Sequence, residues 1–315
     1  MRMRGLPVQA CLLLFLAALL LAWRPAAAEK VALTFDDLPL NGALPAGTTR
    51  SAITRETLAV LKRLDVPPSY GFVNARKLEG SPDGALALRL WVDSGNPVGN
   101  HAYSHMDLHK NTVEDYTRDI VQNEPALELL STRDGSVSES WRWFRYPFLR
   151  EGESLDKRHA VRAFLVKRGY RIAQTTLDYE DYLWNTAYAR CLDRGDKESM
   201  AWLRESYLEM AAAYLKAGRE TAHMAFGREI SHVLLLHLGA FSSTILPDLV
   251  ALLRKEGFQI TTLEDAQSDP VYALDPDIAA KWGGTLTELF MEARSLKYTY
   301  PKKPRERLEK ICVAS

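Results

Sequence analysis

The sequence predicts an α/β fold, namely an α/β barrel or a related closed sheet. Short apolar segments of strand character alternate with longer segments of helical spacing, which is typical of parallel strands joined by helical crossovers. Polar residues follow the predicted strands, where α/β barrels carry their functional groups. An open doubly wound sheet would show a glycine-rich phosphate-binding turn after its first strand, but residues 36–39 read DDLP.

The composition is that of a globular protein and excludes several other classes. The chain has 315 residues, of which 47% are hydrophobic, and its 40 basic residues balance its 40 acidic residues. Balanced charge provides neither the basic field that nucleic acid binding needs nor a polybasic patch for a membrane surface. Three cysteines are too few for a disulfide scaffold or a cysteine-rich metal module.

Residues 1–28 are predicted to be a secretory signal peptide that is cleaved after Ala28. Arg2 and Arg4 precede the apolar run 11–22, and three alanines occupy 26–28. This run is short for a bilayer span of about 20 residues. We therefore expect an exported protein, periplasmic or secreted, with no stable membrane span after cleavage. An uncleaved N-terminal anchor is the alternative.

The first half of the remaining chain alternates between strand and helix signals. The expected elements are a strand at residues 31–35, a helix at 50–64, a strand at 70–73, and helices at 85–92 and 112–130. Two threonines at 48–49 cap the first helix, and two prolines at 67–68 end it. The sequence GNP at 95–97 ends the second helix.

The second half continues the alternation but contains two segments that depart from it. The expected elements are a strand at residues 141–145, a helix at 155–167, strands at 170–176 and 233–236, a helix at 245–255 and a strand at 258–261. The first departure, residues 183–228, is long, helical and rich in aromatic residues. We expect a helical insertion, about 183–230, that packs on the barrel, with a substrate-facing lid as the alternative. The second is a C-terminal extension over residues 266–315.

Two clusters suggest a metal site. Asp36 and Asp37 end the first strand, so one carboxylate can bind a metal while its neighbour faces a bound water. His101 and His105 form an HxxxH spacing, which brings two imidazoles together on one helical turn. Two histidines and one carboxylate leave coordination positions open for water and substrate.

Two further clusters suggest acid–base and oxyanion groups. Arg145 at a strand end can pair with a buried carboxylate, and Pro147 stiffens a turn from which the backbone N–H of Phe148 can face an oxyanion. His237 follows the apolar strand 233–236 and suits a general acid. Its pKa would be raised by an aspartate in the segment DYED at 178–181, either the first or the last of the four.

Together these motifs resemble the NodB-homology polysaccharide deacetylases, carbohydrate esterase family four. TFDD, HxxxH, RxPF, DxxD and LxH occur in the family's order between Thr34 and His237. The resemblance implies a distorted (β/α) barrel and a deacetylase domain over residues 29–265, including the insertion. Leu38 stands where the family usually has Gly, and Tyr182 where it usually has Trp.

The resemblance also implies a role for each motif residue. Those roles are Asp36 as catalytic base, Asp37, His101 and His105 as metal ligands, Arg145 as the residue that tunes the base, Phe148 as backbone donor to the oxyanion, Leu235 in the acetyl-methyl pocket, and His237 as general acid supported by Asp178. The Tyr182 departure keeps Asp181 as an alternative to Asp178. The expected cofactor is a divalent metal, with Zn favoured and Co, Ni or Mn as alternatives.

The implied activity is hydrolysis of N-acetyl groups on the amino sugars of a polysaccharide or oligosaccharide, with release of acetate. The expected partner is therefore an N-acetylated glycan, and no nucleic acid. The alternatives are a hydrolase of the same fold that acts on another N-acyl substrate, and a catalytically silent carbohydrate-binding protein. The sequence leaves open which glycan is used, the oligomeric state, and whether Cys191 and Cys312 form a disulfide.

Overall fold

Parallel strands form the centre of the molecule. The computed structural model describes residues 29–133 and 135–313; the predicted signal peptide, residues 1–28, lies outside this part of the chain. Seven strands pair in the order β7–β6–β3–β2–β1–β8, and β9 pairs with β1 beside β2. The strands are β1 (Lys30–Leu38), β2 (Tyr70–Val73), β3 (Val98–Asn100), β6 (Trp143–Phe144), β7 (Arg171–Ile172), β8 (His232–His237) and β9 (Gln259–Thr261). A hairpin of β4 (Thr132–Arg133) and β5 (Ser136–Val137) lies outside this sheet.

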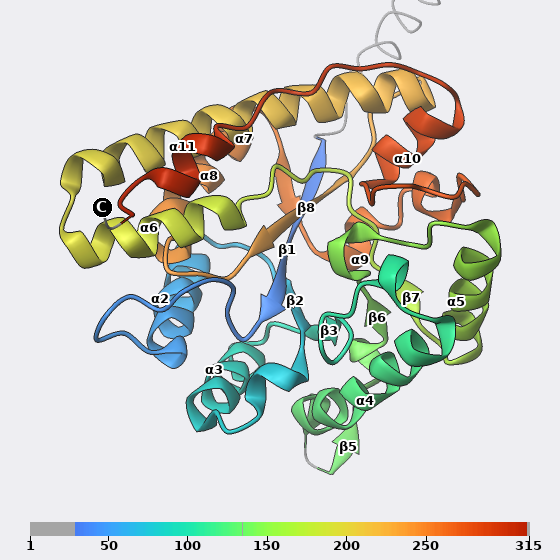
Figure 1. The fold of residues 1–315 in the computed structure, drawn as a ribbon, viewed down its shortest axis with the longest axis horizontal. Coiled ribbons are helices and arrows are strands. Elements are labelled where there is room, and N and C mark those ends of the chain that lie inside the picture. The colour runs from blue at the N-terminus through green and yellow to red at the C-terminus, as the bar shows by residue number, and fades with distance from the viewer. Residues whose placement is uncertain (1–28, 134, 314–315) are drawn as a thin grey trace, which may run out of the picture.

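The two ends of the sheet approach each other through the segment that follows β7. Leu177 forms a parallel bridge with Leu234 of β8. Its N–H donates to Val233 O at 3.1 Å, and its carbonyl accepts from Leu235 N at 3.0 Å. The strands and the helices around them (Figure 1) therefore form a distorted (β/α) barrel, as predicted.

The strands are apolar because helices cover them. In β1 every residue after Lys30 is buried, and in β8 every residue before His237 is buried. Parallel strands with both faces covered have near-continuous apolar runs rather than alternating ones. The runs VALTF and HVLLL have this pattern, so these two strands are readable from the sequence.

Most of the helices begin at a residue whose side chain caps the first turn. They are α2 (Arg50–Arg63), α3 (Pro82–Asp93), α4 (Val113–Ser131), α5 (Leu155–Lys167), α6 (Tyr182–Arg194), α7 (Lys197–Phe226), α8 (Ser242–Lys255), α9 (Leu263–Ala266), α10 (Leu286–Ala293) and α11 (Arg305–Lys310). Thr49, Thr112 and Ser154 each accept a hydrogen bond from the N–H three residues later, which satisfies a donor that the first turn leaves free. Within the described residues, no helix is both long enough and apolar enough to span a membrane.

Several strands are shorter than the sequence predicts. The strand expected at 141–145 is reduced to β6, because Trp141 lies in a short 3-10 turn, and the strand expected at 170–176 is reduced to β7. Strand β3, which precedes His101, was not expected as a strand. Three or fewer paired residues carry too little periodicity to be read from a single sequence.

The helical insertion packs on the barrel, as expected. Helices α6 and α7 lie side by side, and α7 runs along one edge of the molecule (Figure 1). Their aromatic residues face inward: Trp184 and Tyr207 are buried and pack edge to face against each other, and Tyr207 also contacts Phe241 at the start of α8. The aromatic residues of this segment that the sequence analysis noted therefore contribute to the hydrophobic core of the protein.

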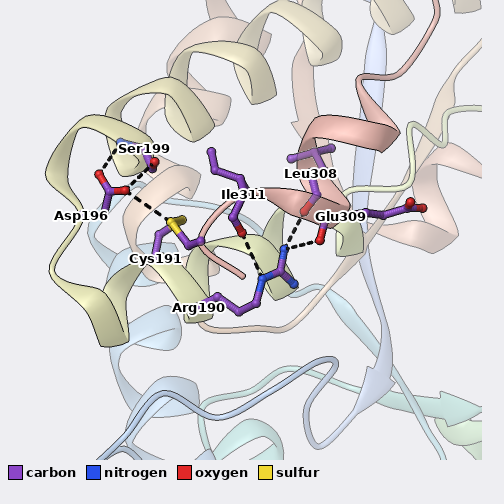
Figure 2. The surroundings of a disulfide bond; sticks show 8 residues. Arg190, Cys191, Asp196, Ser199, Leu308, Glu309 and Ile311 are labelled. Atoms are coloured by element: carbon purple, nitrogen blue, oxygen red, sulfur yellow. Dashed lines mark hydrogen bonds between the residues drawn. A yellow bond between two sulfur atoms is a disulfide. The ribbon is translucent and has the colours of Figure 1, made fainter. Parts of the chain in front are cut away.

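The segment that contains Cys312 is covalently linked to this insertion. Cys191 of α6 and Cys312 form a disulfide, which settles a pairing that the sequence leaves open. Figure 2 shows Arg190 beside it, whose guanidinium donates to Leu308 O at 2.6 Å and to Ile311 O at 3.2 Å. Residues 266–313 thus return across the molecule and end on α6.

Candidate active site

The functional side chains lie at the carboxyl ends of neighbouring strands. Asp36 and Asp37 occupy the end of β1, His237 ends β8, and His101 and Arg145 follow β3 and β6. Asp36 and His237 are register partners in the β1–β8 ladder. Since these strands are parallel, their carboxyl ends share one edge of the barrel, and residues about 200 positions apart in the sequence, such as Asp36 and His237, meet there.

Asp37, His101 and His105 form a group that could hold a metal ion. Their candidate ligand atoms all lie within 4.8 Å of one another. His105 Nε2 is 3.5 Å and His101 Nε2 is 3.9 Å from Asp37 Oδ1. His101 Nδ1 contacts Arg145 O at 2.8 Å, so Nδ1 carries the proton and Nε2 keeps the free lone pair.

The two histidines are not on a helical turn, which corrects the sequence prediction. Residues 101–105 form a loop in which Ala102 and His105 have φ values of 59° and 57°. Side-chain amides take the place of helical hydrogen bonds: Asn74 Nδ2 donates to His101 O at 2.6 Å and to Ala102 O at 2.9 Å. The HxxxH spacing is compatible with either backbone, so it could not distinguish them.

The protonation states of this group suit a divalent cation. Burial lowers the pKa of the His101 and His105 imidazoles, so that both are neutral near pH 7. Burial alone raises the pKa of the Asp37 carboxyl, but the Lys77 ammonium and the two imidazoles outweigh it and hold that pKa well below its ordinary value. Neutral imidazoles and an ionised carboxylate are the forms that bind metal.

One atom of the group lacks a hydrogen bond. Asp37 Oδ1 is buried and accepts none, although Lys77 Nζ lies 3.3 Å away. The other oxygen, Oδ2, accepts from Asn41 Nδ2 at 2.8 Å. A buried carboxylate oxygen without a donor is costly, and a metal coordinated there would satisfy it. The residues present therefore fit the divalent metal that the sequence predicts.

Asp36 is held against a buried arginine. It is 2% exposed, and Arg145 Nη1 lies 3.4 Å from each of its carboxylate oxygens. Arg145 also donates to Ala173 O at 2.6 Å and to Thr34 Oγ1 at 3.1 Å, which fixes the guanidinium. Burial raises the pKa of Asp36 to about 6, against the lowering effect of Arg145. The carboxylate is thus oriented, yet is a stronger base than an exposed aspartate.

The partner of His237 is Asp181 rather than Asp178, which corrects the assignment taken from the resemblance. His237 Nδ1 lies 2.6 Å from Asp181 Oδ1, and the His237 backbone N–H donates to Asp181 Oδ2 at 2.9 Å. Burial lowers the pKa of His237, but Asp181 outweighs it and raises the pKa to about 9. His237 is therefore protonated at neutral pH.

Asp178 has a different place at the same site. Its carboxylate accepts from Glu180 N at 2.7 Å, and burial raises its pKa to about 6. Glu180 adopts a left-handed conformation with φ of 60°, which turns the chain between the two aspartates. The resemblance favoured Asp178 and kept Asp181 as the alternative; the sequence could not show that Asp181 is the partner, because the choice depends on this turn.

The remaining predicted residues line the same pocket, which has a volume of about 570 Å³. Phe148 and Leu149 have φ values of 57° and 52°, so the backbone turns sharply after Pro147. The Phe148 ring packs edge to face on His105 at 4.4 Å, and Leu235 is buried in the pocket wall. All nine predicted site residues border this pocket or, in the case of Arg145, contact one that does.

Sequence reasoning missed several pocket residues. They are Asn41, Tyr146, Leu149, Arg150, Glu180, Tyr182, Trp282, Gly283, Gly284, Glu288 and Lys303. Five of these lie beyond residue 266, in the predicted C-terminal extension, to which the sequence analysis assigned no site residue. The WGG sequence at 282–284 was the available signal. His109, in contrast, accepts from Gly152 N at 3.3 Å and lies outside the metal-binding group.

The fold and the site define a (β/α)-barrel protein in which two histidines and one carboxylate form a group that could hold a metal ion. Residues 24–173 match the family model described as polysaccharide deacetylase. This match confirms the resemblance to the polysaccharide deacetylases that the motifs indicate.

Two relatives illustrate the similarity. The chain resembles the structure of the chitin deacetylase from the fungal pathogen Colletotrichum lindemuthianum with a TM-score of 0.51 and 23% identity, over 76% of this chain and 88% of that chain; this similarity shows the fold. A chitin disaccharide deacetylase from Vibrio alginolyticus is 38% identical over 89 residues, which are 27% of this chain and 18% of that protein. The chain thus spans less than a fifth of the length of that relative.

Proposed function

We propose that this protein is an exported, metal-dependent deacetylase that hydrolyses N-acetyl groups of amino sugars in a polysaccharide or oligosaccharide and releases acetate. The observation that carries the proposal is the convergence of three kinds of group in one pocket. These are a triad that could hold a metal ion, a carboxylate of raised pKa at Asp36, and a protonated imidazole at His237. Amide hydrolysis requires a base for the water and an acid for the leaving amine.

The triad of Asp37, His101 and His105 would hold the metal, for which Zn is favoured and Co, Ni or Mn are alternatives. When bound, a divalent metal polarises the acetamide carbonyl and lowers the pKa of water. Asp36 accepts the proton of the attacking water, while Arg145 keeps this carboxylate in place. The backbone N–H of Phe148 donates to the oxygen of the acetamide as its negative charge develops.

His237 completes the reaction as general acid. It donates its Nε2 proton to the nitrogen of the leaving amine, and Asp181 stabilises the imidazolium before this transfer. The C–N bond breaks, acetate leaves with the oxygen of the water, and the sugar retains an amino group. Leu235 provides an apolar surface for the acetyl methyl group. Asp178 lies in the same pocket, and we propose that its carboxyl contributes to the electrostatic potential of the site. It does not hold the imidazole of His237, which is the role of Asp181.

The test is acetate release from N-acetylglucosamine oligomers and peptidoglycan by protein lacking residues 1–28. Zn-loaded protein should release acetate, chelation should stop it and Zn should restore it, and Asp36→Asn should abolish it. Folding of Asp36→Asn is checked by circular dichroism. If folded, metal-loaded protein releases no acetate but binds the glycans, the protein is a silent binder; release of another acid from an N-acyl panel indicates a different substrate.

A further inference from the structure

We propose that Trp282 is a stacking platform for a second sugar ring, next to the sugar that carries the reacting acetamide. This proposal rests on the proposed function and narrows it. It implies tighter binding of substrates with at least two sugar residues than of a single sugar, and it makes the segment after residue 266 part of the substrate site.

The first argument is the exposure of Trp282. Its side chain is 71% exposed, although the other tryptophans in the described part of the chain are buried or partly buried. Phe148, at 52%, is the other exposed Phe or Trp among the described residues, and both line the pocket that holds the metal-binding group. An exposed indole at the mouth of a polar site is a large apolar surface that the fold itself does not use.

The second argument is that the backbone holds this exposed residue in place. Gly283 has φ of 50°, and a Cβ at this position would lie 2.3 Å from Phe148 O. Gly284 N donates to Leu149 O at 3.3 Å, so the segment docks on the turn whose N–H is the proposed oxyanion donor. A ring mounted on a fixed backbone binds a ligand with little loss of conformational entropy.

The rest of the segment is anchored just as firmly. Leu286 N donates to Thr175 O at 2.7 Å, and Thr285 and Glu288 form a capping box at the start of α10. On the other side of Trp282, the ammonium of Lys281 lies 5.1 Å from the centre of the indole ring. The platform is therefore part of the pocket wall and is not a loose tail.

The third argument is the chemistry of the ligand. A pyranose ring has an apolar C–H face and a polar rim of hydroxyls, so it pairs with a flat aromatic surface that polar groups surround. Lys303 and Glu288 line the same pocket and offer a donor and an acceptor to the rim; Lys303 Nζ is held 3.2 Å from Glu180. Trp282 can therefore stack on the apolar face of a second sugar, while Lys303 and Glu288 form hydrogen bonds with the hydroxyls of that sugar.

The test compares Trp282→Ala and Trp282→Phe with the Zn-loaded parent protein on N-acetylglucosamine and its dimer and tetramer. Loss of this aromatic contact should raise KM for the dimer and tetramer by about 2- to 13-fold, with kcat within about twofold. The monomer should be unaffected, and Trp282→Phe should recover most of the loss. Val166→Ala, also an exposed apolar residue at 72% and outside the pocket, serves as the matched control.

Calorimetry of oligomer binding separates this proposal from the proposed function. If no protein releases acetate but Trp282→Ala binds the tetramer several-fold more weakly than the parent, the deacetylase proposal fails and the platform stands. The platform is overturned if Trp282→Ala leaves both KM and tetramer affinity unchanged. It is also overturned if the variant impairs monomer and tetramer equally, or if the folded parent binds no oligomer.

Discussion

Asp36 and His237 are register partners whose pKa values are both raised, for different reasons. Burial raises the pKa of Asp36 to about 6, whereas the Asp181 carboxylate raises that of His237 to about 9. Between these values the carboxyl is ionised and the imidazole is protonated, which are the states a base and an acid need. The same fold thus gives two neighbouring groups opposite roles at neutral pH.

At the residue scale, Asp181→Asn should shift the alkaline limb of the pH–activity profile. Asp181 makes the largest contribution that raises the His237 pKa to about 9, so without this carboxylate burial should lower the pKa, a smaller fraction of His237 is protonated at pH 8, and activity there should fall about 10-fold. The raised pKa also means that Asp181 stabilises the fold fully below pH 6.5, and that this contribution is lost as pH rises through about 9.

The measurement for this prediction is kcat/KM from pH 5 to 10, with Asp178→Asn as the matched variant. Asp178 does not contact His237 through a hydrogen bond among the described residues, so its variant should keep the alkaline limb near pH 9. An unchanged limb in Asp181→Asn, or an equal shift in both variants, would contradict the assignment.

Also at the residue scale, His101→Ala should weaken Zn binding by more than about 100-fold, because outer partners of metal ligands already contribute 10- to 100-fold. Equilibrium dialysis with metal analysis measures this directly. His109→Ala is the control, because His109 is near the site but outside the metal-binding group. Equal Zn affinity of the two variants would refute the ligand set.

At the scale of elements, loops rather than regular strands and helices set the geometry of the site. Residues 101–105, the turn at Phe148 and the turn at Glu180 all contain left-handed residues other than glycine. Such conformations cost of order 1–3 kcal/mol each and persist only where the surroundings fix them. Here Asn74 fixes the first, and the segment at Gly283 packs on the second.

Gly283→Ala should therefore disturb activity as well as stability. A Cβ there meets Phe148 O at 2.3 Å, which would displace the turn that carries the proposed oxyanion donor. We expect kcat to fall about 10-fold or more, with a lower melting temperature. Gly227→Ala is matched for backbone strain, with φ of 72° and nothing within 4 Å of the new Cβ. It should lose about 1 kcal/mol of stability and keep its kcat, and a similar kcat for both variants would exclude the steric effect.

At the scale of the whole molecule, the disulfide connects the two segments that depart from the barrel alternation. Cys191 and Cys312 are 121 residues apart in the chain, and the intervening residues include α7, β8, α8 and the pocket residues beyond 266. A crosslink that closes a long loop lowers the entropy of the unfolded chain.

Replacing both cysteines, as Cys191→Ser with Cys312→Ser, should lower the free energy of unfolding by about 2–4 kcal/mol. Urea unfolding followed by circular dichroism measures the change, and the parent protein under reducing conditions should match the double variant. An unfolding midpoint that is the same in all three samples would show that the disulfide does not contribute to stability.

The fold class, the strands β1 and β8, most helix positions and the chemical groups of the site could be predicted from the sequence. These properties follow from local patterns: apolar runs, helical spacing, capping residues and motifs such as TFDD and HxxxH. Four features could not be predicted from the sequence and follow from the folded structure. Asp181 pairs with His237, the two histidines lie on a loop, Cys191 and Cys312 form a disulfide, and residues beyond 266 form a wall of the pocket. Each of these features depends on left-handed turns or on contacts between residues that are distant in the chain. Such turns and contacts produce no periodic pattern of apolar residues, so they cannot be predicted from a single sequence.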